Sequence, residues 1–215
     1  MQFQELFSRI IACNSISSID PAIDQGNRPL IDLLANLLQE LDFNCEIMQL
    51  SENKANLIAT RGRGAGGLVL AGHTDTVPCD ESLWQSDPFV LTERNNAWYG
   101  LGCCDMKSFF AIAIEALRDY SKQQFKQPLI ILATADEESS MSGAKALVEA
   151  GRPLARRALI GEPTGMRPVS MHKGIMIEKL TITGSSGHSS NPALGRNAID
   201  TMQSVLTHLL NLRAR

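Results

Sequence analysis

Apolar residues at helical spacing dominate the amino-terminal part of the chain. A first set predicts an amphipathic helix that ends near Asn14 and Ser15, and its members are Phe3, Leu6, Phe7, Ile10 and Ile11. A second stripe predicts another helix, with Pro29 in its first turn, and comprises Leu30, Leu33, Leu34, Leu37, Leu38 and Leu41. Both stripes indicate scaffold, because they contain no group that carries chemistry.

Short aliphatic runs bounded by turn residues then predict strands. Residues 45–50 and 56–60 form two such runs, and a glycine-rich connection at 61–67 leads into a third that ends at His73. The third run is too short for a helix, so we expect a buried strand. Because side chains alternate along a strand, His73 and Asp75 should point the same way at its carboxyl end, where open α/β sheets bind ligands.

His73 and Asp75 together suggest metal chemistry. An imidazole is a common metal ligand, and a carboxylate on the same face can orient its ring. The structural alternative is an ordinary histidine followed by an Asx-type turn that closes the strand before Val77 and Pro78.

Asp105 also has two interpretations. The pattern predicts a short strand at 89–91, a turn at 95–96 and a long helix after Asp105, whose buried face comprises Phe109, Ile112, Ala113, Ala116 and Leu117. A carboxylate at the start of a helix is an ordinary N-cap. The same position suits a metal ligand that projects into a cleft, and the two roles do not exclude each other.

A second aliphatic strand, at 128–135, leads into three consecutive acids, Asp136, Glu137 and Glu138. Acids at the end of a buried strand are costly unless they are solvated, paired or bound to cations. Adjacent side chains diverge, so one of Glu137 and Glu138 can bind metal while the other faces a reacting water. A solvated acidic loop is the alternative.

The remaining chain repeats this theme once and then changes pattern. After a helix at 142–150, a strand at 158–160 delivers Glu162, so a third aliphatic strand ends in a candidate ligand. Alternation at 175–183 then predicts a half-exposed strand of a different sheet. His188 follows in an exposed glycine-serine loop.

A helix at 197–212 comes last, and we place a domain boundary after residue 174, which separates a first domain at 1–174 from a second at 175–215.

Composition limits the function classes. The 215 residues carry 20 Lys and Arg against 23 Asp and Glu, a formal charge of −3 without a basic stripe, so nucleic acid is not an expected partner. No apolar run reaches the ~20 residues of a membrane span, and the amino terminus does not resemble a secretory signal. Five cysteines, an odd number with an adjacent pair, favour a reducing compartment, and we expect the cytoplasm.

The candidate ligands form one set of a histidine and five carboxylates: His73, Asp75, Asp105, Glu137, Glu138 and Glu162. Mixed nitrogen and oxygen ligation suits zinc or a neighbouring first-row metal. A bridging carboxylate suits two ions roughly 3.5–4 Å apart. The set therefore predicts a site for divalent metal ions.

Five ordered motifs resemble the dinuclear-zinc peptidase and deacylase family typified by carboxypeptidase G2: Gly72–Pro78, Asp105–Lys107, Thr134–Glu138, Gly161–Thr164 and Gly187–Ser190. The fuller match within it is to bacterial deacetylases of N-acetylornithine. The resemblance implies an α/β fold in which helices flank a mixed sheet, with the amino-terminal part of a metal-dependent catalytic domain at 1–174. The start of an α+β lid or dimerisation domain would follow at 175–215.

The resemblance also implies a ligand set for two divalent ions, zinc with cobalt as the alternative. His73 and Glu162 would hold one ion, Glu138 would hold the other, and Asp105 would bridge the two.

Catalytic roles follow from the same resemblance. Asp75 would orient and polarise the ligating imidazole, and Glu137 would be the general acid and base. His188 would enter the active site of a partner subunit, as lid histidines do in dimeric relatives. The peptide between Asp105 and Met106 would be cis.

The implied function is hydrolysis of a small-molecule amide, with release of acetate from N2-acetyl-L-ornithine to give L-ornithine in arginine biosynthesis. Succinyl-diaminopimelate or another acylated amino acid is the alternative within the family, and a non-catalytic metal-binding or dimerising fragment is the alternative outside it. The family completes its second metal site with a histidine beyond Arg215. We therefore expect a truncated chain, and a homodimer at full length.

Cys103 and Cys104 depart from the family pattern, which has small or non-thiol residues before the bridging aspartate. Packing is the simpler interpretation. The alternative is that these thiols make the site sensitive to oxidation or to soft metals.

Overall fold

The computed structural model describes residues 1–171, 173–174 and 178–213. The chain divides into two units, Met1–Pro168 and Val169–Arg215. This division falls before the boundary predicted after residue 174. The assignment of the two parts as a catalytic domain and a lid domain stays a prediction.

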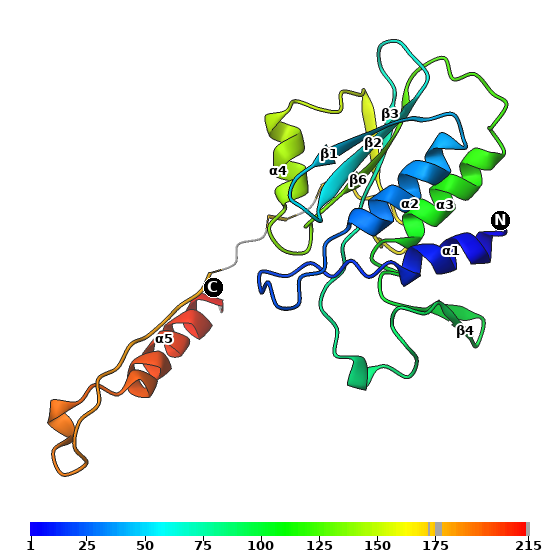
Figure 1. Ribbon diagram of the computed structural model, residues 1–215. Coiled ribbons are helices and arrows are strands. Elements are labelled where there is room, and N and C mark those ends of the chain that lie inside the picture. Colours follow the sequence, from blue (N-terminus) through cyan, green and yellow to red (C-terminus); the bar gives the residue numbers. More distant parts are fainter. Residues whose placement is uncertain (172, 175–177, 214–215) are drawn as a thin grey trace. The chain divides into compact units, whose positions relative to one another are not determined.

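A five-stranded mixed sheet runs through the first unit (Figure 1). Its strands, in spatial order, are β1 (Asn44–Gln49), β2 (Ala55–Arg61), β6 (Leu129–Thr134), β3 (Leu68–His73) and β7 (Arg157–Ile160). β2 pairs antiparallel with both β1 and β6, whereas β6, β3 and β7 run parallel. The expected α/β fold with a mixed sheet is confirmed.

Helices cover both faces of this sheet, with α1, α2 and α3 on one side and α4 on the other (Figure 1). Their bounds are Phe3–Ala12, Arg28–Gln39, Ser108–Arg118 and Ser142–Glu149. Alternation along β2 divides the core accordingly: Leu57 and Ala59 pack with α1, α2 and α3, whereas Ile58 packs with Leu147 of α4. The predicted amino-terminal helices are confirmed.

The parallel strands bring three chain segments to one edge of the sheet. In the register, His73 of β3 lies opposite Thr134 of β6, and Ala71 of β3 lies opposite Ile160 of β7. The segments that follow these three strands therefore leave the sheet at the same edge. This edge is where the sequence analysis placed the candidate ligands. β7 is the outer strand here, and Leu159 and Ile160 are 50% and 64% exposed.

The predicted strand at 89–91 is wrong. Asp87 closes a turn there, because its carboxylate accepts from the backbone N–H of Phe89 at 2.8 Å and its carbonyl accepts from that of Val90 at 3.2 Å. A hairpin follows instead, made of β4 (Thr92–Arg94) and β5 (Ala97–Tyr99). The turn predicted between them is confirmed, since Asn95 and Asn96 both have left-handed φ angles of 53° and 59°. A short 3₁₀ turn, η1 (Glu81–Leu83), precedes this region.

α3 buries a different face from the one predicted. Ala113 and Leu117 are buried as expected, but Ile112 is 56% exposed and Ala116 is also exposed. Phe110 and Ile114 fill the core instead, at 0% and 2% exposed. The run 109–117 is apolar on almost every side, so its periodicity does not single out one face.

The second unit contains η2 (Pro192–Leu194) and α5 (Ala198–Arg213), which agrees with the helix predicted at 197–212. The alternating strand predicted at 175–183 is not found in its described part, because residues 178–183 have no strand pairing. Residues 175–177 of that prediction lie outside the described residues. In the described part of the whole chain, no helix is long and apolar enough to cross a membrane.

The core described above predicts a stability difference within α3. Phe110→Ala should lower the free energy of unfolding by about 3–5 kcal/mol, because it removes a fully buried ring and leaves a cavity. Ile112→Ala is the control on the same helix, with a loss below about 1 kcal/mol. Urea unfolding followed by circular dichroism measures both, and equal losses would contradict the orientation of α3.

Candidate metal centre

The site centres on His73, the last residue of β3, which is only 2% exposed. Its Nδ1 lies 2.9 Å from the backbone oxygen of Asp75. A carbonyl oxygen can only accept, so Nδ1 carries the proton, and in the neutral ring the lone pair belongs to Nε2. Nε2 lies 3.0 Å from Asp105 Oδ1 and 3.8 Å from Glu162 Oε1. The imidazole thus presents its unprotonated nitrogen to carboxylates, which suits metal ligation.

Two groups of possible ligands share this histidine. His73, Asp105 and Glu162 form one group, and His73, Glu137 and Glu138 form the other. Within each group the ligand atoms lie within 4.8 Å of one another. The structure therefore brings together five of the residues singled out from the sequence, although they come from four separate segments.

Asp75 supports the imidazole from the buried side. It is 2% exposed, and its Oδ2 accepts from the backbone N–H of Glu138 at 3.0 Å. Its Oδ1 is buried without a hydrogen-bond partner among the described residues and lies 3.6 Å from His73 Nδ1. Burial raises the pKa of Asp75, against the lowering effects of the Glu138 N–H and the charge of His73. An unsatisfied buried carboxylate oxygen beside a ligand imidazole fits a metal centre, where that carboxylate orients the ring.

The charges of the cluster also fit a divalent cation. Burial lowers the pKa of His73, but the charges of Asp75, Glu162 and Glu137 outweigh burial and raise it. Burial also raises the pKa of Glu138 and that of Glu162, and the like charge of Asp105 adds to the rise at both. One imidazole cannot balance this many acids, so a divalent ion would relieve their repulsion.

Asp105 is not the N-cap of α3, so that interpretation was wrong. The helix begins at Ser108, Lys107 occupies the cap position, and no side chain makes a capping hydrogen bond there. The Asp105–Met106 peptide is cis, as the family resemblance implies. Met106 is buried, and its sulfur accepts from the backbone N–H of His73 at 3.3 Å. The side chain of Asp105 remains 51% exposed, free to act as a ligand.

Asp136 is the acid of the 136–138 run that does not join the cluster. Its carboxylate pairs with the Lys54 ammonium at 2.6 Å. Burial raises the pKa of Asp136, but the hydrogen bonds from Lys54, Ser142 and Ser17 outweigh burial and lower it. The three consecutive acids therefore have two different environments.

Lys107 is a buried residue whose position the sequence analysis missed. It is 1% exposed, and its ammonium donates to the backbone oxygens of Ile11 at 3.3 Å and Cys13 at 2.8 Å, at the end of α1. Burial lowers its pKa to about 8, although the nearby thiols of Cys13 and Cys103 oppose the shift. Lys107 follows Asp105 closely in the chain, so it fastens the Asp105 segment to α1. The sequence gives no signal for this burial, because a lysine beside the start of a helix is ordinarily exposed.

The adjacent thiols behave differently from each other. Cys103 packs against the core, which confirms the packing interpretation for this residue, whereas Cys104 is exposed. Burial raises the pKa of Cys103 to about 11, so its thiol stays protonated and is a poor metal ligand. Neither thiol belongs to a ligand group among the described residues.

His188 belongs to the second unit, and its side chain is exposed. Its Nδ1 accepts from the backbone N–H of Ser190 at 3.2 Å and lies 2.7 Å from the Ser190 hydroxyl.

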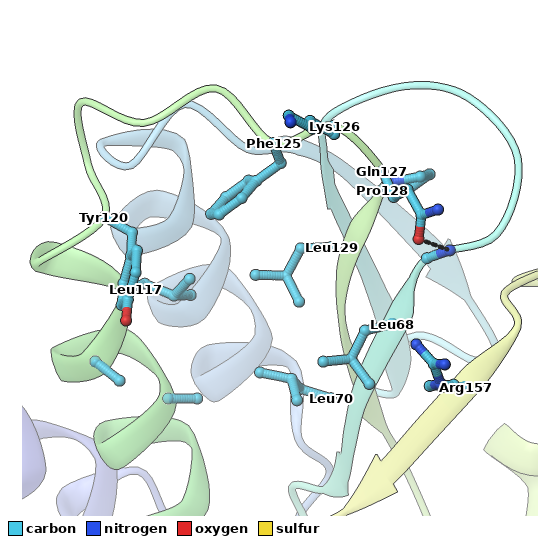
Figure 2. A pocket seen from close by; sticks show the side chains of 13 residues that line it. Leu68, Leu70, Leu117, Tyr120, Phe125, Lys126, Gln127, Pro128, Leu129 and Arg157 are labelled. Atoms are coloured by element: carbon cyan, nitrogen blue, oxygen red, sulfur yellow. Dashed lines mark hydrogen bonds between the residues drawn. The ribbon is translucent and has the colours of Figure 1, made fainter.

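Figure 2 shows the side chains that line a cavity of about 660 Å³. The cavity lies at the amino-terminal ends of the parallel strands, whereas the cluster lies at their carboxyl ends. Leu68, Leu129 and Arg157, the first residues of β3, β6 and β7, contribute to its wall together with Tyr120 and Phe125. Its lining is mostly apolar and holds no carboxylate. The cavity is therefore separate from the candidate metal centre.

Comparison with known proteins agrees with this arrangement. Residues 69–212 match the model of peptidase family M20/M25/M40. The chain belongs to this family. Hydrolases of the family act on amide bonds and are metal-dependent.

Curated relatives are similar along almost the whole chain. An acetylornithine deacetylase of Photorhabdus laumondii is 53% identical over 213 residues, which are 98% of this chain and 55% of that protein. An acetylornithine deacetylase of Pasteurella multocida is 50% identical and is covered to 56%. The chain thus spans about half the length of the curated relatives it matches.

A solved structure supports the fold. Human carnosine dipeptidase 1 aligns with a TM-score of 0.66 at 22% identity, covering 74% of this chain and 38% of that one. At this identity the likeness supports the fold alone.

The burial of Lys107 predicts a pH dependence of stability. Between pH 8 and 10.5 the unfolded chain retains a proton on this lysine that the folded chain has lost, so the free energy of unfolding rises with pH. Relative to Lys107→Met, the wild-type chain should gain on the order of 2 kcal/mol across this window. Urea unfolding at several pH values measures the difference. Lys122→Met, at an exposed position, is the control and should give a curve parallel to wild type. A parallel curve for Lys107→Met would contradict the burial of Lys107.

Proposed function

We propose that the whole protein is a metal-dependent amide hydrolase that releases acetate from N2-acetyl-L-ornithine and yields L-ornithine, a step of arginine biosynthesis. The observation that carries this proposal is the cluster in which a buried imidazole at the end of β3 is surrounded by carboxylates from two further strand ends and from the segment before α3. The acetylornithine deacetylases at 50% and 53% identity support the choice of substrate.

The distances support a ligand assignment for two ions. In this proposal His73 and Glu162 would hold one ion and Glu138 the other, with Asp105 as the ligand common to both; the candidate groups and the distances from His73 to Asp105 and Glu162 support this assignment. Zinc is the preferred metal and cobalt the alternative, because the donors are one nitrogen and several carboxylate oxygens. Asp75 holds the Nδ1 side of the imidazole, which fixes the tautomer that leaves Nε2 free.

The remaining groups of the cluster account for the proton transfers. Bound metal ions would supply Lewis acidity, which would lower the pKa of a bound water towards about 7 and polarise the amide carbonyl. Glu137 takes a proton from a water molecule, and the oxygen of that water attacks the carbonyl carbon of the acetyl group. The carbon–nitrogen bond then breaks, and Glu137 delivers the proton to the departing amine. In the proposed homodimer, His188 of the partner subunit would stabilise the developing oxyanion, in the role that the family resemblance assigns to it.

We also propose a homodimeric cytoplasmic enzyme with a small molecule as its substrate. The odd number of cysteines supports the reducing compartment, and the net charge of −3 supports a small molecule over nucleic acid. A metal-binding fragment without turnover is the second candidate for the 215-residue chain itself. It is favoured by the coverage of only 55–56% of the curated relatives.

Substitution of the general acid and base tests the mechanism. Glu137→Gln in the whole protein should reduce kcat for acetylornithine at least about a hundredfold, because the amide cannot accept the proton of water. Metal content, measured by atomic emission, should stay near that of wild type, since Glu137 is not an assigned ligand. Glu149→Gln, on the exposed end of α4, is the matched control and should retain activity. Substantial turnover by Glu137→Gln would refute the assigned role.

The same assays compare acetylornithine with succinyl-diaminopimelate. Faster hydrolysis of acetylornithine supports the proposed substrate, and the reverse order would reassign the protein to the desuccinylases.

Metal binding by the 215-residue chain tests the ligand assignment. His73→Gln should abolish tight cobalt binding, because His73 is the one nitrogen donor and belongs to both ligand groups. His208→Gln, at an exposed position of α5, is the control and should bind as wild type does. Titration followed by the visible absorption of bound cobalt measures both. Unchanged binding by His73→Gln would place the metal elsewhere.

A further inference from the structure

Asp136 is buried beside the metal centre without belonging to it. It follows β6 directly, is 5% exposed, and has a left-handed φ angle of 60°. Four side chains donate hydrogen bonds to its carboxylate: Lys54 at 2.6 Å and Ser17 at 2.8 Å to Oδ1, and Ser142 at 2.6 Å and Ser140 at 3.4 Å to Oδ2. A carboxylate with this many donors has nearly all of its acceptor capacity used within the protein.

These donors come from separate parts of the fold. Ser17 lies in the loop after α1, Lys54 precedes β2, and Ser142 begins α4. The backbone oxygen of Asp136 also accepts from the N–H of Met141 at 2.6 Å. One residue therefore closes the 136–142 turn and fastens it to the scaffold.

The two metal-site glutamates lie in this turn, immediately after the anchor. On their other side, the backbone N–H of Glu138 donates to Asp75 Oδ2 at 3.0 Å. The segment 137–138 is thus held at one end by the Asp136 side chain and at the other by Asp75. In this doubly attached segment, the ligand atoms of Glu137 and Glu138 lie within 4.8 Å of each other and of His73.

The anchor acts against a repulsive force. Glu137, Glu138 and Asp105 gather around one imidazole, and like charges at such distances favour an outward movement of the turn. The side chains of Lys54 and Asp136 are only 13% and 8% exposed, so salt screens their attraction weakly. Lys54 also binds Asp24 at 2.8 Å, so the ammonium has two separate carboxylate partners.

We propose that Asp136 is a positioning residue of the metal centre. Its bonds to Lys54, Ser17 and Ser142 hold the 136–142 turn, which places Glu138 as a metal ligand and Glu137 as the general acid and base. This inference rests on the metal-dependent function proposed above. Asp136 touches neither metal nor substrate and acts through the turn. Loss of its charge should therefore change metal affinity and geometry while all assigned ligands remain.

Cobalt binding by the 215-residue chain tests the inference. Asp136→Asn should weaken cobalt binding by at least about tenfold and change the intensity of the visible bands, because the amide cannot form the ion pair with Lys54. Asp24→Asn is the matched control: it removes the other carboxylate on the same ammonium, and among the described residues the Asp24 carboxylate bonds to Ser18 and Lys54 rather than to residues 136–142. Its dissociation constant should stay within about threefold of wild type.

Each outcome decides one point. Asp136→Asn with wild-type affinity and wild-type bands would overturn the inference, even if its melting temperature falls, because a merely structural role predicts that result. If this variant does not unfold cooperatively, Ser142→Ala removes only one donor, and unchanged cobalt affinity there would likewise overturn it. A wild-type chain that binds no cobalt would refute the metal centre itself, so failure of the proposed function is distinguishable.

Discussion

The parallel pairing of β3 with β6 and β7 is the constraint on which the rest of the structure depends. Parallel strands end at the same edge, so the strand pairing alone brings together the residues that follow His73, Thr134 and Ile160. The segment before α3 adds Asp105 to the same edge. β1 and β2 contribute core rather than chemistry, since their pairing is antiparallel.

This convergence concentrates negative charge, and the fold holds it with hydrogen bonds of two kinds. Backbone groups position the imidazole and Asp75, through the Asp75 carbonyl and the Glu138 N–H. Side chains fix the acidic turn: Lys54 and Ser17 reach it from distant segments, and Ser140 and Ser142 belong to the turn itself. Partial burial strengthens these bonds because little water competes for them. The site is therefore built into the scaffold at its base, while Asp105 and Glu162 stay open to solvent.

Much of this site could be predicted from local pattern. Aliphatic runs followed by His73, Glu137 or Glu162 identify strands with polar ends, and one edge of the sheet then brings those ends together. Sequence pattern does not predict the structure correctly where tertiary contacts determine which residues are buried or where a turn forms. The run 109–117 is apolar nearly all round, so only packing selects Phe110 over Ile112 for the core. Asp87 closes a turn where hydrophobicity alone favours a strand, and Lys107 is buried by carbonyls from a helix almost a hundred residues away.

The ligand groups extend from His73 to Glu162, so the centre exists only after the chain between them has closed several large loops. An unfolded chain keeps the same donors at distances that no single ion can span, and its affinity for metal is correspondingly low. Folding and metal affinity are thereby linked by mass action, and a bound ion acts as a cross-link across the carboxyl edge of the sheet. With the ion in excess, metal occupancy would therefore report the folded fraction of the first unit.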